Sequence, residues 1–179
     1  MRPGARLFFA LRPPPPVRRE LARAGRQFLR SGGGRAVSPA RLHLTLSYIG
    51  VVDPSRLSAL LLAPRLVQAA PFPLCLDTLG AFARVHVGWA GSLEPPPALL
   101  DLQARLGQAL AEAGFHERER RDFAPHVTLA RDLSVGARPP PLGCEPLCWG
   151  VRRFSLLAAE PGQARYAWLG SWPLAGKAR

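Results

Sequence analysis

Residues 41–49 read RLHLTLSYI, and residues 123–131 read FAPHVTLAR. Both stretches predict β-strands, because apolar and polar residues alternate in them and β-branched or aromatic residues are frequent. Each stretch contains the tripeptide His-x-Thr, and the two copies lie almost half a chain length apart. A tripeptide repeated on two similar strands indicates an internal duplication.

The segments before the two His-x-Thr strands also correspond. Each strand follows an apolar strand-like run, a proline run and a helix-like run, at 6–11, 13–16 and 17–28 and again at 85–89, 95–97 and 99–113. Prolines are tolerated at the start of a helix but not inside it. We therefore expect one domain over 1–179, with pseudo-repeats at about 6–50 and 84–131. Further strands are predicted at 72–79, 147–157 and 165–169, with a turn at 80–82.

Strand alternation places the chemistry on one side of each strand. Residues i and i+2 point to the same face, so His43 and Thr45 are expected together, opposite Leu44. The same holds for His126 and Thr128. Two imidazoles that titrate near neutrality suit a reaction with one general acid and one general base. The threonine hydroxyls can bind phosphate oxygens.

Charge points to a polyanionic partner. Lys and Arg number 24 against 12 Asp and Glu, which gives a formal net charge of +12. Lys177 is the only lysine, so a genome-wide preference for arginine codons can explain the Arg:Lys ratio but not the excess of positive charge. Nucleic acid is the first candidate partner. A stripe of arginines on the first predicted helix is expected to be solvated, and it could also follow an RNA backbone; it consists of Arg19, Arg23, Arg26 and Arg30.

Other classes of protein and site are disfavoured. No run of 18 apolar residues predicts a transmembrane helix, and the apolar run near the start is too short for a signal peptide. We expect a cytoplasmic protein whose three cysteines (Cys75, Cys144 and Cys148) are thiols. No metal-ligand motif or glycine-rich phosphate loop is present, so neither a metal nor a cofactor is expected.

The chain resembles the bacterial and archaeal RNA 2′,3′-cyclic phosphodiesterases, also called 2′-5′ RNA ligase-like proteins, of the two-histidine (2H) phosphoesterase superfamily. The resemblance rests chiefly on His43-Leu-Thr-Leu46 and on the nine residues 123–131. Weaker support comes from the opening strand 6–11, from Leu79-Gly-Ala-Phe82 and from Pro161-Gly162 followed by Tyr166.

The resemblance implies an α+β fold that is bilobal and duplicated, with two antiparallel sheets facing a central groove and helices outside. It implies metal-independent hydrolysis of a terminal RNA 2′,3′-cyclic phosphate to a 2′-phosphate, with reversal giving 2′-5′ ligation. On this pattern His43 is the proton donor and His126 the proton acceptor, and the near symmetry of the motifs permits the exchange of these roles. Thr45, Thr128 and Arg131 would bind the phosphoryl oxygens. We expect the protein to act as a monomer.

Alternative functions and roles stay open at this point. A non-catalytic RNA-binding module, or a 2H phosphoesterase for a small cyclic nucleotide, would use the same groove. Ser47 stands where the family usually has a basic residue, and on simple alternation it shares the His43 side. Phe82 could stack on a base at the groove rim or pack in the core. His86 is expected to be structural and His116 solvated.

Overall fold

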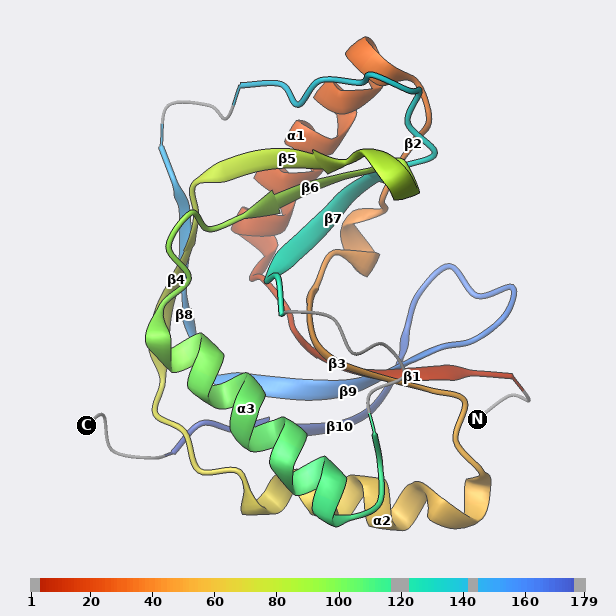
Figure 1. The fold of residues 1–179 in the computed structure, drawn as a ribbon, viewed down its shortest axis with the longest axis vertical. Helices are drawn as coiled ribbons and strands as arrows, with labels where there is room; N and C mark the ends of the chain where they lie inside the picture. Colours follow the sequence, from red (N-terminus) through yellow and green to blue (C-terminus); the bar gives the residue numbers. More distant parts are fainter. Residues whose placement is uncertain (1–3, 117–122, 142–144, 176–179) are drawn as a thin grey trace.

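The computed structural model describes residues 4–116, 123–141 and 145–175 (Figure 1). Its α-helices are α1 (Pro15–Gly32), α2 (Leu57–Leu62) and α3 (Pro97–Glu112). Its strands are β1 (Arg6–Leu11), β2 (Arg35–Ala36), β3 (Leu44–Gly50), β4 (Phe72–Leu76), β5 (Thr78–Phe82), β6 (Val87–Gly91), β7 (His126–Arg131), β8 (Leu147–Val151), β9 (Arg153–Ala159) and β10 (Ala167–Pro173).

An antiparallel sheet with the strand order β10-β9-β1-β3-β7-β6-β5 forms the centre of the molecule, and β2 pairs with β7. β4 and β8 form a separate two-stranded sheet. The predicted α+β class is confirmed. The two antiparallel sheets that the resemblance implies are joined into one sheet here, through the β3–β7 pair of Leu44 and Val127 and through the pairing of β2 with β7.

Helices α1 and α3 occupy equivalent places in the chain. α1 connects β1 to β3, α3 connects β6 to β7, and each connected pair of strands is antiparallel. Both helices have proline at their N-caps (Pro14 and Pro96) and within their first turns, as the proline runs predict. Each helix packs across the junction: α1 lies against β6 and β7, and α3 against β3 and β4 (Figure 1).

Close packing holds α1 on β7. A Cβ atom on Gly25 would lie 2.8 Å from the carbonyl oxygen of Leu129, so only glycine allows the helix to approach this strand so closely. Phe28 and Leu21 of the same helix are fully buried. The apolar stripe of α3 is buried as well, through Leu99, Leu102, Leu106 and Leu110. The two His-x-Thr strands therefore rest on a continuous core.

Local corrections concern two of the predicted strands. The predicted strand 72–79 is divided at Asp77 into β4, which pairs with β8, and β5, which pairs with β6. The sequence predicts a turn at 80–82, but these residues continue β5. The predicted strand 147–157 is divided at Arg152 into β8, which pairs with β4, and β9, which pairs with β1 and β10. One apolar run thus serves two sheets, and strand propensity alone cannot show where it divides. The predicted strand 165–169 corresponds to β10, which pairs antiparallel with β9.

The thiol prediction is wrong for two cysteines. Cys75 and Cys148 face each other across the β4–β8 pair, with Cα atoms 4.0 Å apart, and form a disulfide. Cys144 lies outside the described residues. The sequence separation of 73 residues leaves no local sign of the pairing, because strand register decides it.

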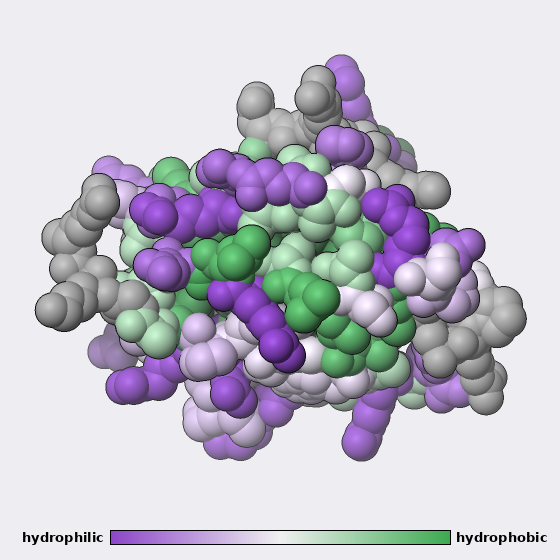
Figure 2. Space-filling model, turned by 90° about the horizontal axis from the view of Figure 1, so that it is seen from below, coloured by the Kyte–Doolittle hydropathy of each residue, from purple (hydrophilic) through white to green (hydrophobic). Residues whose placement is uncertain are grey.

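The face that includes α2 is mixed in character. Seen from below, hydrophobic side chains gather in its middle, with hydrophilic side chains around them (Figure 2). Leu62 of α2 and Leu66 beyond it are more than half exposed. No helix within the described residues is long and apolar enough to cross a membrane.

Candidate active site

A cavity of about 720 Å³ opens beside the junction of β3 and β7. It is lined by four of the five predicted site residues, namely His43, Thr45, Thr128 and Arg131. His126, the fifth, begins β7 two residues before Thr128. The structure therefore gathers the predicted residues from the two halves of the chain at one place.

The Leu44–Val127 pair fixes how the two motifs meet. Both side chains are 0% exposed and point into the core. Because the strands are antiparallel, the neighbours of Leu44 meet the neighbours of Val127 in reverse order. His43 consequently lies on the Thr128 side of the junction, and Thr45 lies on the His126 side. Each histidine is thus the cross-strand neighbour of the other motif's threonine.

Both imidazoles are oriented in the same way. The Nδ1 atom of His43 lies 2.6 Å from the carbonyl oxygen of Arg41, and that of His126 lies 2.7 Å from the carbonyl oxygen of Ala124. A carbonyl can only accept, so each Nδ1 carries its hydrogen and donates it. In the neutral ring the lone pair is then on Nε2. Each histidine can accept a proton at Nε2 or, once protonated, donate one from that atom.

Burial keeps both imidazoles neutral in the free protein. The pKa of His43 is lowered to about 4, first by burial and then by the nearby Arg131, His126 and Arg41, although the hydrogen bond to the Arg41 carbonyl raises it. The pKa of His126 is also lowered, first by burial and then by Arg131. The charge of Arg131 therefore acts on both histidines.

Aromatic rings support each histidine. The ring of His43 lies 4.7 Å from that of Phe8 and 5.2 Å from that of Tyr166, the latter edge-on. The ring of His126 lies 5.0 Å from that of Phe82, also edge-on. The sequence leaves Phe82 open between base stacking and packing, and the structure places it against an imidazole of the site. These ring contacts and the Nδ1 hydrogen bonds together hold each imidazole in one orientation.

Arginines that the sequence did not single out also line the cavity. They are Arg6, Arg35 and Arg41. The guanidinium group of Arg41 lies over the ring of Tyr166, 4.6 Å from its centre. Arg35 pairs with Asp132 and lies beside Arg131 in the β2–β7 ladder. Arg6 and Arg35 come from other elements, and Arg41 lies only two residues before His43, but the His-x-Thr spacing itself marks none of the three.

Ser47 does not share the groove face. The β1–β3 ladder changes register between Phe9 and Ala10, which inserts an extra residue in β3 between Thr45 and Ser47. Tyr48 consequently lines the cavity beside Thr45. Ser47 is 2% exposed, and its Oγ has no hydrogen-bond partner within the described part of the chain. The expectation from simple alternation is wrong, because the bulge reverses the faces.

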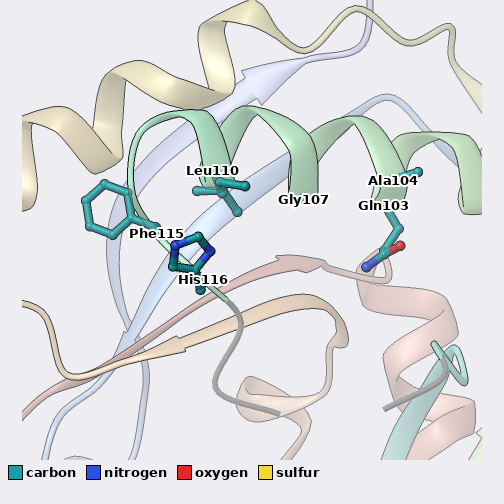
Figure 3. Close-up of a pocket in the computed structure, with 7 residues that line it drawn as sticks. Gln103, Ala104, Gly107, Leu110, Phe115 and His116 are labelled. Atoms are coloured by element: carbon teal, nitrogen blue, oxygen red, sulfur yellow. The ribbon is translucent and has the colours of Figure 1, made fainter. Parts of the chain in front are cut away.

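The remaining histidines lie elsewhere. His86 adopts a left-handed backbone conformation, and its Nδ1 donates to the carbonyl oxygen of Leu133 at 2.8 Å, so the structural role expected of it is confirmed. His116 is exposed and follows the end of α3, where it lines a different cavity of about 570 Å³ with Phe115, Leu110 and Gln103 (Figure 3). Neither histidine takes part in the β3–β7 site.

Metal-ligating side chains do not gather in this site. Among residues 4–116, 123–141 and 145–175, no three His, Cys, Asp or Glu side chains form a group that could hold a metal ion. Positive charge in the groove comes instead from guanidinium groups, which present several donors to oxygen anions.

Known proteins are similar to this chain in sequence and in fold. An RNA 2′,3′-cyclic phosphodiesterase of Escherichia coli (strain K12) is 34% identical over 171 residues, which cover 94% of this chain and 96% of that protein. One from Thermus thermophilus is 32% identical over 166 residues, covering 87% and 82% of the two chains.

Solved structures agree with these relatives. The crystal structure of E. coli LigT complexed with 3′-AMP superposes with a TM-score of 0.84 at 34% identity, covering 95% of this chain and 98% of that one. The T. thermophilus protein TT0787 superposes with a TM-score of 0.77 at 29% identity, covering 97% and 100%. The family model described as the 2′-5′ RNA ligase superfamily matches residues 13–158. With its two His-x-Thr strands joined at one cationic groove, the chain belongs to the 2′-5′ RNA ligase superfamily.

Proposed function

We propose that the protein hydrolyses the terminal 2′,3′-cyclic phosphate of RNA to a 2′-phosphate. The observation that carries the proposal is the pair of imidazoles at the β3–β7 junction, each with Nδ1 bound to a carbonyl and Nε2 available. Arginines around the groove fit a phosphate and an RNA backbone. The E. coli and T. thermophilus relatives that carry this activity in their names support the choice of substrate.

The reaction divides between the two histidines. Nε2 of His126 takes a proton from a water molecule as its oxygen attacks phosphorus. The bond between phosphorus and O3′ breaks, and His43 gives a proton from Nε2 to the departing O3′. Thr45, Thr128 and Arg131 hold the non-bridging oxygens, whose charge increases in the transition state. Each proton-transfer group is expected to contribute about 10²–10⁴ in rate.

The opposite assignment is the second candidate, and one observation favours it. A general acid must be protonated before the reaction, yet burial lowers the pKa of His43 to about 4. Under the first assignment, the bound phosphate must raise the pKa of His43 enough to protonate it. Under the exchanged assignment, His126 donates the proton and His43 accepts one from water.

Catalysis without a metal is part of the proposal. The donor sets described above support it, because guanidinium and hydroxyl groups in the groove can stabilise charge on the phosphoryl oxygens. The reverse reaction, in which an RNA 5′-hydroxyl replaces water, would form a 2′-5′ linkage with the same two histidines. We propose that the protein acts as a monomer in the cytoplasm.

A duplicated, bilobal origin also belongs to the proposal. The repeats at about 6–50 and 84–131 each contain a strand, a proline-started helix and a His-x-Thr strand. Each helix packs on a strand of the other repeat, so neither unit is complete alone. The near equivalence of the two histidines then follows from descent from one ancestral unit.

Phosphorus NMR on a short RNA ending in 2′,3′-cyclic phosphate tests the proposal. With excess EDTA, the cyclic phosphate signal should be replaced by that of a 2′-phosphomonoester. A nucleoside 2′,3′-cyclic phosphate run beside it separates an RNA enzyme from one that prefers a small nucleotide. Salt-dependent RNA binding without any product would instead identify a non-catalytic RNA-binding module.

A further inference from the structure

A second cationic cavity adjoins the groove. It has a volume of about 410 Å³ and is lined by four arginines and by no acidic residue. Two of them, Arg12 and Arg18, are half-buried, and the other two, Arg19 and Arg165, are exposed. They converge from the end of β1, the first turn of α1 and the segment before β10. This clustering depends on the fold, because the four residues are not neighbours in sequence.

No carboxylate lines this cavity among the residues that the structure describes. The ion pairs within the described ranges are Arg23–Glu20, Arg35–Asp132 and Arg105–Asp101. None of them includes an arginine of the second cavity. Burial lowers the pKa of Arg12, and the charge of Arg18 lowers it further. Like charges held together without carboxylates favour the binding of an anion.

Arg12 is held in place from two sides. Its Nη2 donates to the carbonyl oxygen of Ala40 at 3.3 Å, and its guanidinium carbon lies 4.8 Å from the centre of the Trp168 ring. The start of α1 provides no backbone donors here at its first two positions, because Pro15 and Pro16 lack N–H groups. Recognition of an anion would therefore depend on guanidinium groups, which suit the paired oxygens of a phosphate.

The second cavity and the groove share a wall. Tyr166 lines both. The short helix η1 (Pro39–Arg41) lies between them, since Ser38 and Arg41 line the groove while Pro39 and Ala40 line the second cavity. An extended RNA strand whose end lies in the groove can thus pass Tyr166 and reach the arginines of the second cavity.

We propose that the second cavity binds a backbone phosphodiester of the RNA whose cyclic phosphate end occupies the groove. This inference rests on the function proposed above. It adds to that function a direction for the bound RNA, which would run from the groove towards the second cavity. It also divides the arginine stripe of α1, because Arg19 lines the cavity while Arg23, Arg26 and Arg30 do not. The protein would accordingly prefer an oligonucleotide to a nucleoside cyclic phosphate, which has no second phosphate.

The experiment compares a double variant, Arg18→Gln with Arg165→Gln, against a control that removes the same charge. The control is Arg26→Gln with Arg65→Gln, two exposed arginines that line none of the three cavities described. For each protein, kcat/KM is measured on a short RNA ending in 2′,3′-cyclic phosphate and on a nucleoside 2′,3′-cyclic phosphate.

The double variant should lose roughly tenfold in kcat/KM on the RNA, as expected when hydrogen bonds to a charged group are removed. It should keep its rate on the nucleoside cyclic phosphate, and the control should keep both rates. The slope of log affinity against log salt for the RNA product should become shallower by about 0.7 for each phosphate that the variant no longer binds.

Equal losses on the two substrates, or no loss on the RNA, would overturn the second phosphate site. A loss of the same size in the control would do so as well, because it would show an effect of overall charge. Failure of the proposed function differs from these outcomes, since the unsubstituted protein would then open neither cyclic phosphate, and the inference would fall with it.

Discussion

Leu44 and Val127 pair across the junction of β3 and β7, and both side chains are fully buried. This pair and the β2–β7 pairing link the two halves of the central sheet, and the Leu44–Val127 register sets how the two His-x-Thr motifs meet. The residues on either side of it, His43 with Thr45 and His126 with Thr128, point away from the core. An apolar contact therefore positions a polar site, since the strand alternation that buries one face exposes the other.

Acid should destabilise the protein through His43. Its pKa is about 4 in the folded protein, whereas an unfolded histidine titrates near 6.5, so the unfolded chain binds the proton more readily between these values. The free energy of unfolding should fall as the pH drops from about 6.5 towards 4. His43→Gln should weaken this dependence in urea unfolding, and His116→Gln, at an exposed position, should not. An unchanged dependence in His43→Gln would show that burial does not keep this imidazole neutral.

The threonine hydroxyls should contribute to the rate and not to the fold. Thr45→Val and Thr128→Val keep the side-chain shape but remove the donor, so each should lower kcat/KM by about tenfold to a hundredfold. Thr78→Val provides the control, because this residue is in β5 and lines neither the groove nor the second cavity. Normal rates in both site variants would remove the hydroxyls from the phosphate site.

The charge of Arg131 should be measurable as an effect on the pKa values of the two histidines. Its charge lowers the pKa of both His43 and His126, so Arg131→Gln should raise both. NMR titration of the imidazole C–H signals measures this directly, and kcat/KM should fall in the same variant. Arg26→Gln, on the exposed side of α1, should change neither. Histidine titrations that do not move in Arg131→Gln would contradict an electrostatic effect of Arg131 on the two rings.

A substrate with a better leaving group should distinguish the acid from the base. Sulfur in place of O3′ departs as a thiolate and needs little help from a proton, so loss of the general acid matters less. On this 3′-thio cyclic phosphate, His43→Ala should regain much of its activity if His43 is the acid, and His126→Ala should not. The reverse pattern would establish the exchanged assignment that the low pKa of His43 favours.

The sequence predicted the parts of the site that depend on local rules. Alternation along a strand requires only neighbouring residues, so the common face of His43 and Thr45, and that of His126 and Thr128, could be foreseen. Proline runs at two equivalent places likewise predicted the starts of α1 and α3. The charge of the chain indicated a polyanion without showing where it would bind.

Features that depend on strand register could not be foreseen. The bulge in β3 turns Ser47 into the core and brings Tyr48 to the groove. The residue types at these positions do not predict the bulge. The Cys75–Cys148 disulfide and the arrival of Arg35 beside Arg131 depend on pairings between distant strands. Tyr166 joins the site because the β9–β10 hairpin places it against His43.

Single-turnover kinetics with excess EDTA test the central claim most directly. The substrate is an RNA ending in 2′,3′-cyclic phosphate, and the proteins are the unsubstituted chain, His43→Ala, His126→Ala and the double variant. Each single variant should lose about 10²–10⁴ in rate, and the double variant should lose much less than the product of the two losses. Rapid opening of the cyclic phosphate by either single variant would contradict the two-histidine mechanism.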